Sequence, residues 1–298
     1  MTKSENVKIL ITGATGTIGK ELIQTLSAQN VDFRALVRSE LVRSEKDAQG
    51  LSALDGIEAV IGDFNDAETV ANALYNIDRA FLLTNSSEQA ETQQKEFINI
   101  AGRMGVKHIV KLSQWAADID SPVRFLRYHA VVEQKIIESG MSYTFLRPNL
   151  FMQGLLGFRE TIIAQGKFFA AAGNTKISAV DVRDIAAVAV AALIEEGHER
   201  KIYNLTGPEA LTHQEIAEKL SNALNRHIEF IDIPPEAMRQ ALIHVGFPEW
   251  QAEGLIEDYA HYCRGEAAEV FKDIQAVTGK PPHSFDDFAH DYAPAFSE

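Results

Sequence analysis

Segments with the character of strands and helices alternate through the first half of the chain. Runs rich in Val, Ile, Leu and Phe recur along it, and patterns typical of amphipathic helices separate them. Strands joined in this way pair in parallel, because each helix returns the chain to the starting edge of the sheet. We predict strands at Val7–Thr12, Phe33–Val37, Glu58–Ile61, Ala80–Leu83, His108–Leu112 and Tyr143–Leu146, and helices at Gly19–Gln29, Ala67–Tyr75, Ser87–Met104 and Arg124–Ser139.

This alternation predicts an α/β protein with a Rossmann-type, doubly wound parallel sheet over residues 1–148. After Pro148 the helical patterns lengthen, so we expect residues 149–298 to form a smaller, mostly helical substrate region. A segment near residues 177–205 is expected to return to the sheet, with Lys201–Leu205 as its strand. A capping box at Thr212 opens a further helix. Ligands of open α/β sheets bind at the carboxyl ends of the strands, which directs the search for a site to that edge.

Composition excludes several classes of protein. The chain carries 28 Lys and Arg against 42 Asp and Glu, a formal charge of −14, which disfavours a nucleic-acid binder. Its apolar runs are too short to span a membrane, and the N-terminus lacks a signal-peptide pattern, so a cytoplasmic protein without a membrane partner is expected. Cys263 is the only cysteine and the histidines form no compact ligand pattern, so we expect no metal site.

A glycine-rich turn follows the first predicted strand and opens the first helix. Glycines at this place let the backbone approach a pyrophosphate, while the helix N-terminus presents unpaired N–H groups to it. The position between a strand and a helix favours dinucleotide binding over a turn without a ligand. The expected contacts are Gly13, Thr15, Gly16, Thr17, Ile18 and Gly19.

The spacing G-x-x-G-x-x-G resembles that of the short-chain dehydrogenase/reductase superfamily. Two further features are similar to it: Gly62-Asp63-Phe64 after the third strand, and the segment Val180–Ile185. The resemblance implies that Asp63 and Phe64 lie at the adenine and that Ser113 occupies the place of the catalytic serine. Thr84 and Gln114 at strand ends are expected to line the nicotinamide, with Asn149 also among the cofactor contacts.

The end of the second strand indicates which cofactor binds. A carboxylate there would bind the ribose 2′-hydroxyl of NAD, and an arginine would accept the 2′-phosphate of NADP. Arg38 follows the strand, and the stretch from Ala35 to Ser39 contains no Asp or Glu. NADP is therefore favoured, with NADPH preferred over NADH. A perfect tandem copy, Leu36–Glu40 and Leu41–Glu45, leaves open whether Arg38 or Arg43 holds the phosphate.

The helix that normally carries the catalytic pair of the superfamily is unusual here. That pair is a Tyr and a Lys four residues apart, but Val132 stands four residues after Tyr128, and Lys135 is about two helical turns away. The helix instead places His129 and Glu133 on one face. A histidine oriented by a carboxylate donates a proton or a hydrogen bond near neutral pH, whereas the plainer interpretation is a surface pair that holds the helix.

His-x-x-x-Glu, followed by Ser139–Pro148, resembles the NmrA-like branch of the superfamily. Gly105–Ile109 and Lys201–Thr206 are also similar to it. The branch includes quinone reductases, triphenylmethane-dye reductases and redox-sensing regulators. The resemblance implies an NADPH-dependent oxidoreductase with His129, Glu133, Tyr128 and Ser113 as candidate catalytic residues.

Three functions remain open. The first is an NADPH-dependent reductase that transfers hydride to a quinone or to a conjugated dye of azo or triphenylmethane type, with a small aromatic or quinonoid substrate as partner. Such an acceptor delocalises the added charge, so orientation matters more than acid catalysis. The second is an NAD(P)-sensing regulator without turnover. The third is an epimerase or dehydratase. We rank it last because that chemistry normally uses the Tyr and Lys pair, which this helix lacks. Either a monomer or a homodimer is compatible with the sequence.

Overall fold

The computed structural model describes residues 9–38 and 57–297, and the chain folds into two compact units. The first unit contains the residues up to Ile119 together with Tyr128–Arg147 and Ile185–Tyr203. The second contains Asp120–Arg127, Pro148–Asp184 and Asn204–Glu298. The chain crosses between the units several times, so neither unit is one continuous stretch of sequence.

The first unit is built on a sheet in the order β3-β2-β1-β4-β5-β6-β8. Its strands are β1 (Ile9–Ile11), β2 (Phe33–Val37), β3 (Ile57–Ile61), β4 (Arg79–Leu82), β5 (His108–Leu112), β6 (Ser142–Pro148) and β8 (Lys201–Leu205). The neighbours from β3 to β6 pair in parallel. Strand order reverses between β1 and β4, which is the switch point where ligands of doubly wound sheets bind.

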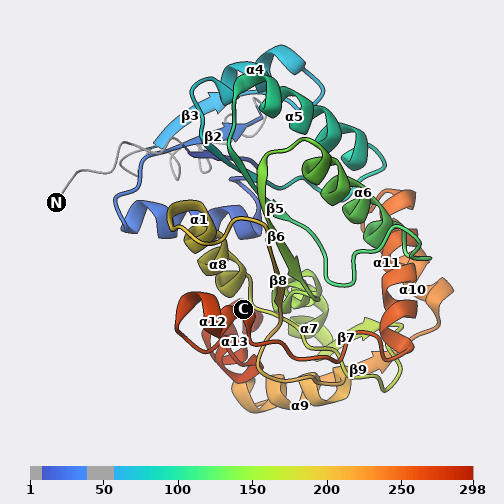
Figure 1. The fold of residues 1–298 in the computed structure, drawn as a ribbon. Coiled ribbons are helices and arrows are strands. Elements are labelled where there is room, and N and C mark those ends of the chain that lie inside the picture. Colours follow the sequence, from blue (N-terminus) through green and yellow to red (C-terminus); the bar gives the residue numbers. More distant parts are fainter. Residues whose placement is uncertain (1–8, 39–56, 298) are drawn as a thin grey trace. The chain divides into compact units, whose positions relative to one another are not determined.

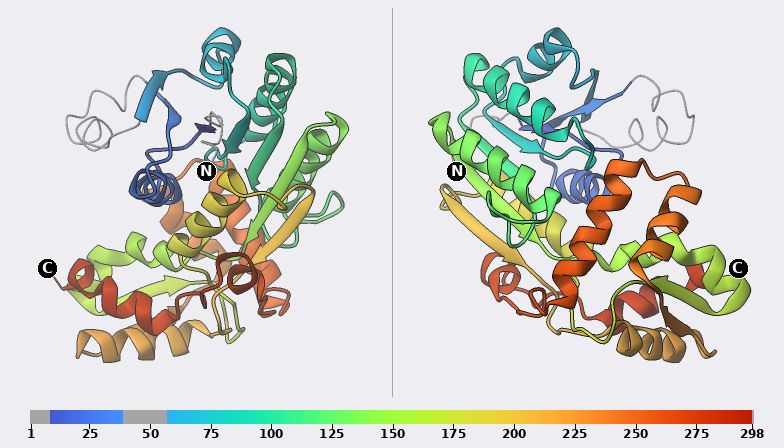
Figure 2. Two further views of the ribbon diagram at one scale, coloured as in Figure 1. Left: turned by 60° about the vertical axis from the view of Figure 1, so that its left-hand side comes forward. Right: turned by 90° about the vertical axis from the view of Figure 1, so that its right-hand side faces the viewer.

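Helices cover both faces of this sheet. They are α1 (Thr17–Ala28), α4 (Ala67–Leu74), α5 (Ala90–Met104), α6 (Arg124–Glu138) and α8 (Val182–Ile194). Figures 1 and 2 show α4, α5 and α6 on one face and α1 and α8 on the other. Strands enclosed in this way are buried on both sides, and every residue of β1, β2 and β5 is buried, including Arg34 and Lys111.

The predicted α/β fold with a Rossmann-type sheet is confirmed. Phe33–Val37, His108–Leu112 and Lys201–Leu205 have the predicted bounds, and the other predicted elements differ by a few residues at their ends. Of the first predicted strand, Val7 and Lys8 lie outside the described residues, and β1 ends at Ile11, one residue before the predicted end at Thr12. The predicted capping box at Thr212 is also present.

Two side chains tie the first unit together across its sheet. The Thr12 hydroxyl lies 2.9 Å from the Phe81 carbonyl oxygen and accepts from the Leu83 N–H at 2.8 Å, so it closes the switch point between β1 and β4. On β2, Arg34 donates to the carbonyl oxygens of Ala73 and Tyr75 at the end of α4. These bonds satisfy carbonyls that the helix leaves unpaired at its C-terminus.

The second unit is mostly helical around a two-stranded parallel sheet. Its elements are η1 (Met152–Phe158), α7 (Arg159–Gln165), β7 (Lys167–Ala170), α9 (His213–Leu224), β9 (Glu229–Asp232), α10 (Pro235–His244), α11 (Glu249–Cys263), α12 (Asp273–Thr278), α13 (Phe285–Asp291) and η2 (Ala293–Phe296). One apolar core joins β7, β9, α9 and α13, with Phe168, Phe285 and Phe288 among its fully buried side chains.

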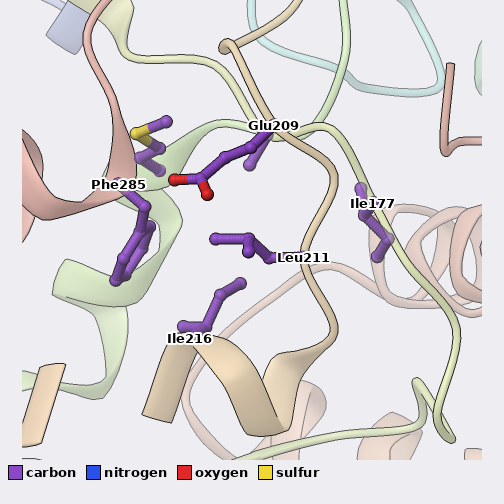
Figure 3. Close-up of a pocket in the computed structure, with 7 residues that line it drawn as sticks. Ile177, Glu209, Leu211, Ile216 and Phe285 are labelled. Atoms are coloured by element: carbon purple, nitrogen blue, oxygen red, sulfur yellow. The ribbon is translucent and has the colours of Figure 1, made fainter. Parts of the chain in front are cut away.

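A small pocket lies inside this second unit. It is lined by Met152, Ile177, Ala179, Glu209, Leu211, Ile216 and Phe285. Figure 3 shows the Glu209 carboxylate among otherwise apolar walls. The carboxylate has a cationic neighbour, because Oε1 of Glu209 lies 3.4 Å from Nζ of Lys219. Among residues 9–38 and 57–297, no helix has the length and apolarity needed to cross a bilayer.

Among the described glycines, Gly19 leaves the least room for a Cβ atom. A Cβ atom there would lie 2.1 Å from the Gly13 carbonyl oxygen, so Gly19→Ala must displace the turn. We expect a loss of about 1–3 kcal/mol in the free energy of unfolding, measured by urea denaturation. Gly102→Ala is the matched control, since nothing lies within 4 Å of its Cβ and it is exposed in α5. It should stabilise the protein by about 0.5–1 kcal/mol, and equal effects of the two substitutions would contradict the packing argument.

Candidate functional site

The carboxyl ends of β1, β4 and β5 meet at one edge of the first unit, because these neighbouring strands run parallel. The glycine-rich turn follows β1, Thr84 lies two residues beyond β4, and Ser113 and Gln114 follow β5. Residues from distant parts of the sequence therefore share one edge, as the parallel fold predicts.

The turn after β1 has the geometry that its glycines require. Gly13 adopts a φ of +66°, a conformation that is strained for other residues, and its carbonyl oxygen accepts from the Gly16 N–H at 3.0 Å. Gly19 packs against Gly13, as described above. Gly16 is exposed, and its Cβ position faces only the Gly13 carbonyl oxygen at 3.3 Å. Gly13 and Gly19 are thus required by the conformation and packing of the turn. Gly16 instead leaves the exposed surface of the turn without a side chain.

Helix α1 begins directly at this turn and has features suited to an anion. Its N-cap, Gly16, makes no side-chain capping bond, and the first turn contains no acidic residue. The first N–H groups of a helix have no partner within the helix and carry the positive end of its dipole. Thr17 is exposed at the start of the helix, while Ile18 is buried beneath it. Thr15 is half-buried in the turn.

The residues expected near the adenosine lie at the ends of β2 and β3. Arg38 is exposed immediately after β2, and Arg43 lies outside the described residues. Asp63 is exposed and its carboxylate accepts from the Asn65 N–H at 2.7 Å. The Phe64 ring packs against Phe97 of α5, with ring centroids 5.6 Å apart. The ring contact holds the turn after β3 against α5. Asp63, in the same turn, remains at the surface.

The end of β5 contains a buried lysine in contact with His129. Lys111 is fully buried, and its Nζ lies 2.9 Å from Nδ1 of His129 and donates to the Leu112 carbonyl oxygen at 2.9 Å. Burial lowers the pKa of Lys111 to about 7, although the charge of Glu133 opposes the shift. Burial also lowers the pKa of His129 well below its usual value, and the charges of Lys111 and Arg147 act in the same direction. His129 is therefore neutral at pH 7.

Glu133 contacts other partners than the sequence suggested. It accepts from the Ser113 hydroxyl at 2.5 Å and forms a two-point ion pair with Arg147, whose Nε lies 2.9 Å from Oε1. The expectation that Glu133 orients His129 is wrong in this respect, because the partner of the imidazole is Lys111. The alternative of a surface pair fails as well, since both side chains are buried. Ser113 gives its hydroxyl hydrogen to Glu133, so its oxygen can act toward a further group only as an acceptor.

Tyr128 lies beside His129 on α6, with ring centroids 4.1 Å apart, and its hydroxyl is 3.1 Å from the Ser86 hydroxyl. The position one turn further along the helix is the fully buried Val132. The phenol therefore has no lysine where the superfamily pair would place one. Lys111 reaches the cluster from the sheet instead, and its contact is with the imidazole.

The remaining predicted contacts fall into different units. Thr84 accepts from Nε2 of Gln94 at 2.7 Å, and Gln114 is half-buried after β5, so both belong to the edge of the first unit. Asn149 belongs to the second unit, where its amide group donates to the Ser178 hydroxyl and to the Ala267 carbonyl oxygen, both at 2.9 Å. These bonds use both amide hydrogens to join segments of that unit.

Sequence reasoning overlooked Lys111, Arg147 and Gln94. The signal for Lys111 was present, because a lysine in the middle of an apolar strand must find buried partners. Arg147 lies one residue beyond the predicted sixth strand, Tyr143–Leu146, but within the observed β6 (Ser142–Pro148). No group of His, Cys, Asp and Glu suited to a metal ion occurs within residues 9–38 and 57–297.

Comparison with known proteins places this arrangement among oxidoreductases. The chain is 37% identical to an NAD(P)H azoreductase of Xenophilus azovorans, over 97% of this chain and 99% of that protein. It is 30% identical to quinone oxidoreductase 2 of Escherichia coli, over 92% and 94% of the two chains. The structure of the triphenylmethane reductase of Citrobacter sp. in complex with NADP(H) matches with a TM-score of 0.81 and 27% identity, over 96% of this chain and 99% of that one.

The family pattern described as the NmrA-like family matches residues 5–284. The resemblance drawn from His129, Glu133 and the segment that follows them is thereby confirmed. Since the match extends over most of the chain and the relatives cover nearly its full length, this protein belongs to the NmrA-like family.

Proposed function

We propose that this protein is an NADPH-dependent reductase that transfers hydride to quinones and conjugated dyes, azo compounds included. The observation that carries the proposal is the cluster at the end of β5, where a neutral, buried His129 stands in place of the tyrosine and lysine pair. The cluster therefore lacks the tyrosine and lysine pair with which the superfamily protonates simple carbonyl substrates. It suits an acceptor whose conjugation stabilises the product of hydride addition. The names of the azoreductase and quinone oxidoreductase relatives support the same substrate class.

The residues of the first unit fit a dinucleotide with a 2′-phosphate. Gly13 and Gly19 form a turn that side chains would fill, and the start of α1 offers unpaired N–H groups to a pyrophosphate. Arg38 gives the end of β2 an exposed guanidinium, which can grip a phosphate with two parallel hydrogen bonds. When bound, the reduced nicotinamide supplies the hydride.

The chain's own residues position the reactants at this edge. Ser113, held by Glu133, presents lone pairs that suit an amide N–H such as that of the nicotinamide carboxamide. Thr84, held by Gln94, has its hydroxyl hydrogen free to donate because its oxygen already accepts from the amide. Fixed donors and acceptors of this kind reduce the cost of orienting the reacting groups.

The preference for NADPH depends on Arg38. Arg38→Ala removes a charge-assisted contact worth about 1.5–3 kcal/mol, so we expect NADPH affinity to fall at least about tenfold while NADH affinity changes little. Titration by cofactor fluorescence measures both. Arg103→Ala on the exposed surface of α5 serves as the control. Equal affinities of the wild type for the two cofactors would contradict the assignment, and a loss confined to Arg43→Ala would move the role to that residue.

Gly16 tests the cofactor site separately from the fold. Because its Cβ position is exposed, Gly16→Val should leave a folded protein, yet the side chain would occupy the space at the start of α1 where a pyrophosphate binds. We expect NADPH binding to be lost while the far-UV circular dichroism spectrum is retained. Normal affinity in a folded variant would rule out this turn as the pyrophosphate site.

The roles of Tyr128 and His129 are separated by single-turnover oxidation of NADPH with a quinone. Tyr128→Phe should slow the reaction less than about tenfold, below the ~10²–10⁴-fold typical of losing a positioned proton donor, because its phenol lacks the lysine. His129→Ala should cost more, because the imidazole helps to position the acceptor, and some turnover should remain. A collapse confined to Tyr128→Phe would restore the ordinary dehydrogenase mechanism. If the wild type and both variants bind NADPH tightly but none oxidises it, the result would favour the alternative function, an NAD(P)-sensing regulator without turnover.

A further inference from the structure

Lys111 is a buried cation that the proposed function does not use. It lies on the interior strand β5, fully buried, and its Nζ contacts the imidazole of His129 from the sheet side. Burying an amine is unfavourable unless it gains partners, and its partners here are one carbonyl oxygen and one ring nitrogen. A methionine or leucine would fill this strand position without that cost, so the amine requires a functional explanation.

Hydrogen bonding between the two side chains determines the tautomer of His129. A protonated lysine has three donors and no acceptor, so its Nζ must donate to Nδ1. The single ring proton of the neutral imidazole then sits on Nε2, on the other side of the ring. No bond of Nε2 occurs among the described residues. The pair therefore presents a fixed N–H donor at Nε2 of His129. When Nε2 gives up its proton, Lys111 can supply another to the ring at Nδ1.

We propose that Lys111 and His129 form a proton relay that extends this reductase from quinones to azo acceptors. The inference rests on the proposed function. As hydride adds to one azo nitrogen, the π pair moves to the other nitrogen, which takes the proton from Nε2 of His129. Nδ1 then takes a proton from Nζ of Lys111, which remains as a neutral amine and is reprotonated from solvent before the next turnover. The net change is one hydride and one proton added across the N=N bond.

The two acceptor classes differ in their need for this proton. Hydride addition to a quinone leaves a phenolate-type oxygen, and a phenol has a pKa of about 10, so the anion persists until water protonates it. Hydride addition to an azo group leaves charge on nitrogen, a much stronger base that requires a proton as the bond forms. The relay therefore contributes to azo reduction and little to quinone reduction.

The electrostatic surroundings allow the relay to operate near neutral pH. Burial lowers the pKa of Lys111 to about 7, so the amine can give up a proton there, while the charge of Glu133 favours its protonated form. The charge of Arg147 acts on His129 and helps to keep the imidazole neutral, and the Tyr128 phenol is bonded to Ser86. Since the relay needs protonated Lys111, the rate of azo reduction should be highest below pH 7 and fall as pH rises above it.

The test compares single-turnover NADPH oxidation with one azo dye and one quinone across about pH 5–9, an interval that spans about two units on either side of the lowered pKa of Lys111, about 7. Lys111→Met should lower the azo rate about 10²-fold and the quinone rate less than about tenfold, and should remove the pH dependence near 7. Lys107→Met is the control, because that lysine precedes the same strand but is exposed and paired with Asp78. Its ratio of azo to quinone rates should equal that of the wild type.

His129→Ala provides a second variant, which matters if Lys111→Met folds poorly. Although it retains Lys111, it should also lose the pH dependence near 7, and adding Lys111→Met to it should change the azo rate little further. Equal losses with both acceptors in Lys111→Met, or a retained inflection in His129→Ala, would overturn the relay and leave the proposed function standing. A wild type that reduces the quinone alone would overturn the relay and the azo part of the proposed function, and would leave only its quinone part. A wild type that oxidises NADPH with neither acceptor would refute both.

Discussion

A parallel sheet brings the carboxyl ends of its strands to one edge, and the candidate site of this protein depends on that constraint. The strand order reverses between β1 and β4, and Thr12, directly after β1, joins the two strands by bonding to Phe81 and Leu83 at the end of β4. The glycine turn and the ends of β4 and β5 face the same space. Functional side chains far apart in the sequence become neighbours for this reason alone.

The second constraint is the cost of burying charge. Lys111, Glu133 and Arg147 are each largely withdrawn from water, and each is stable there only because its hydrogen-bonding groups find partners. The ion pair between Glu133 and Arg147 joins α6 to β6, and the Ser113 hydroxyl extends it to the end of β5. A network of this kind holds its members in one geometry, which a site based on orientation requires.

Much of the fold could be predicted from the sequence. The alternation of apolar runs and helical patterns is set by local residue choice, so the strands at Phe33–Val37 and His108–Leu112 were predicted with their observed bounds. The glycines could also be predicted, because a turn between strand and helix restricts the backbone locally. The family could be predicted from His129, Glu133 and the motif that follows, since these are patterns within one stretch of chain.

The partners of the site residues could not be predicted in the same way. Spacing along a helix put His129 and Glu133 on one face and suggested that they contact each other, but the sheet offered each of them a stronger partner. Asn149 was predicted to contact the cofactor, whereas its amide joins segments within the second unit. The sequence by itself determined the elements, their order and the glycine turn, because these depend on near neighbours in the chain. Only the tertiary structure decided which charged groups meet, because β5, α6 and β6 come together through packing and not through spacing.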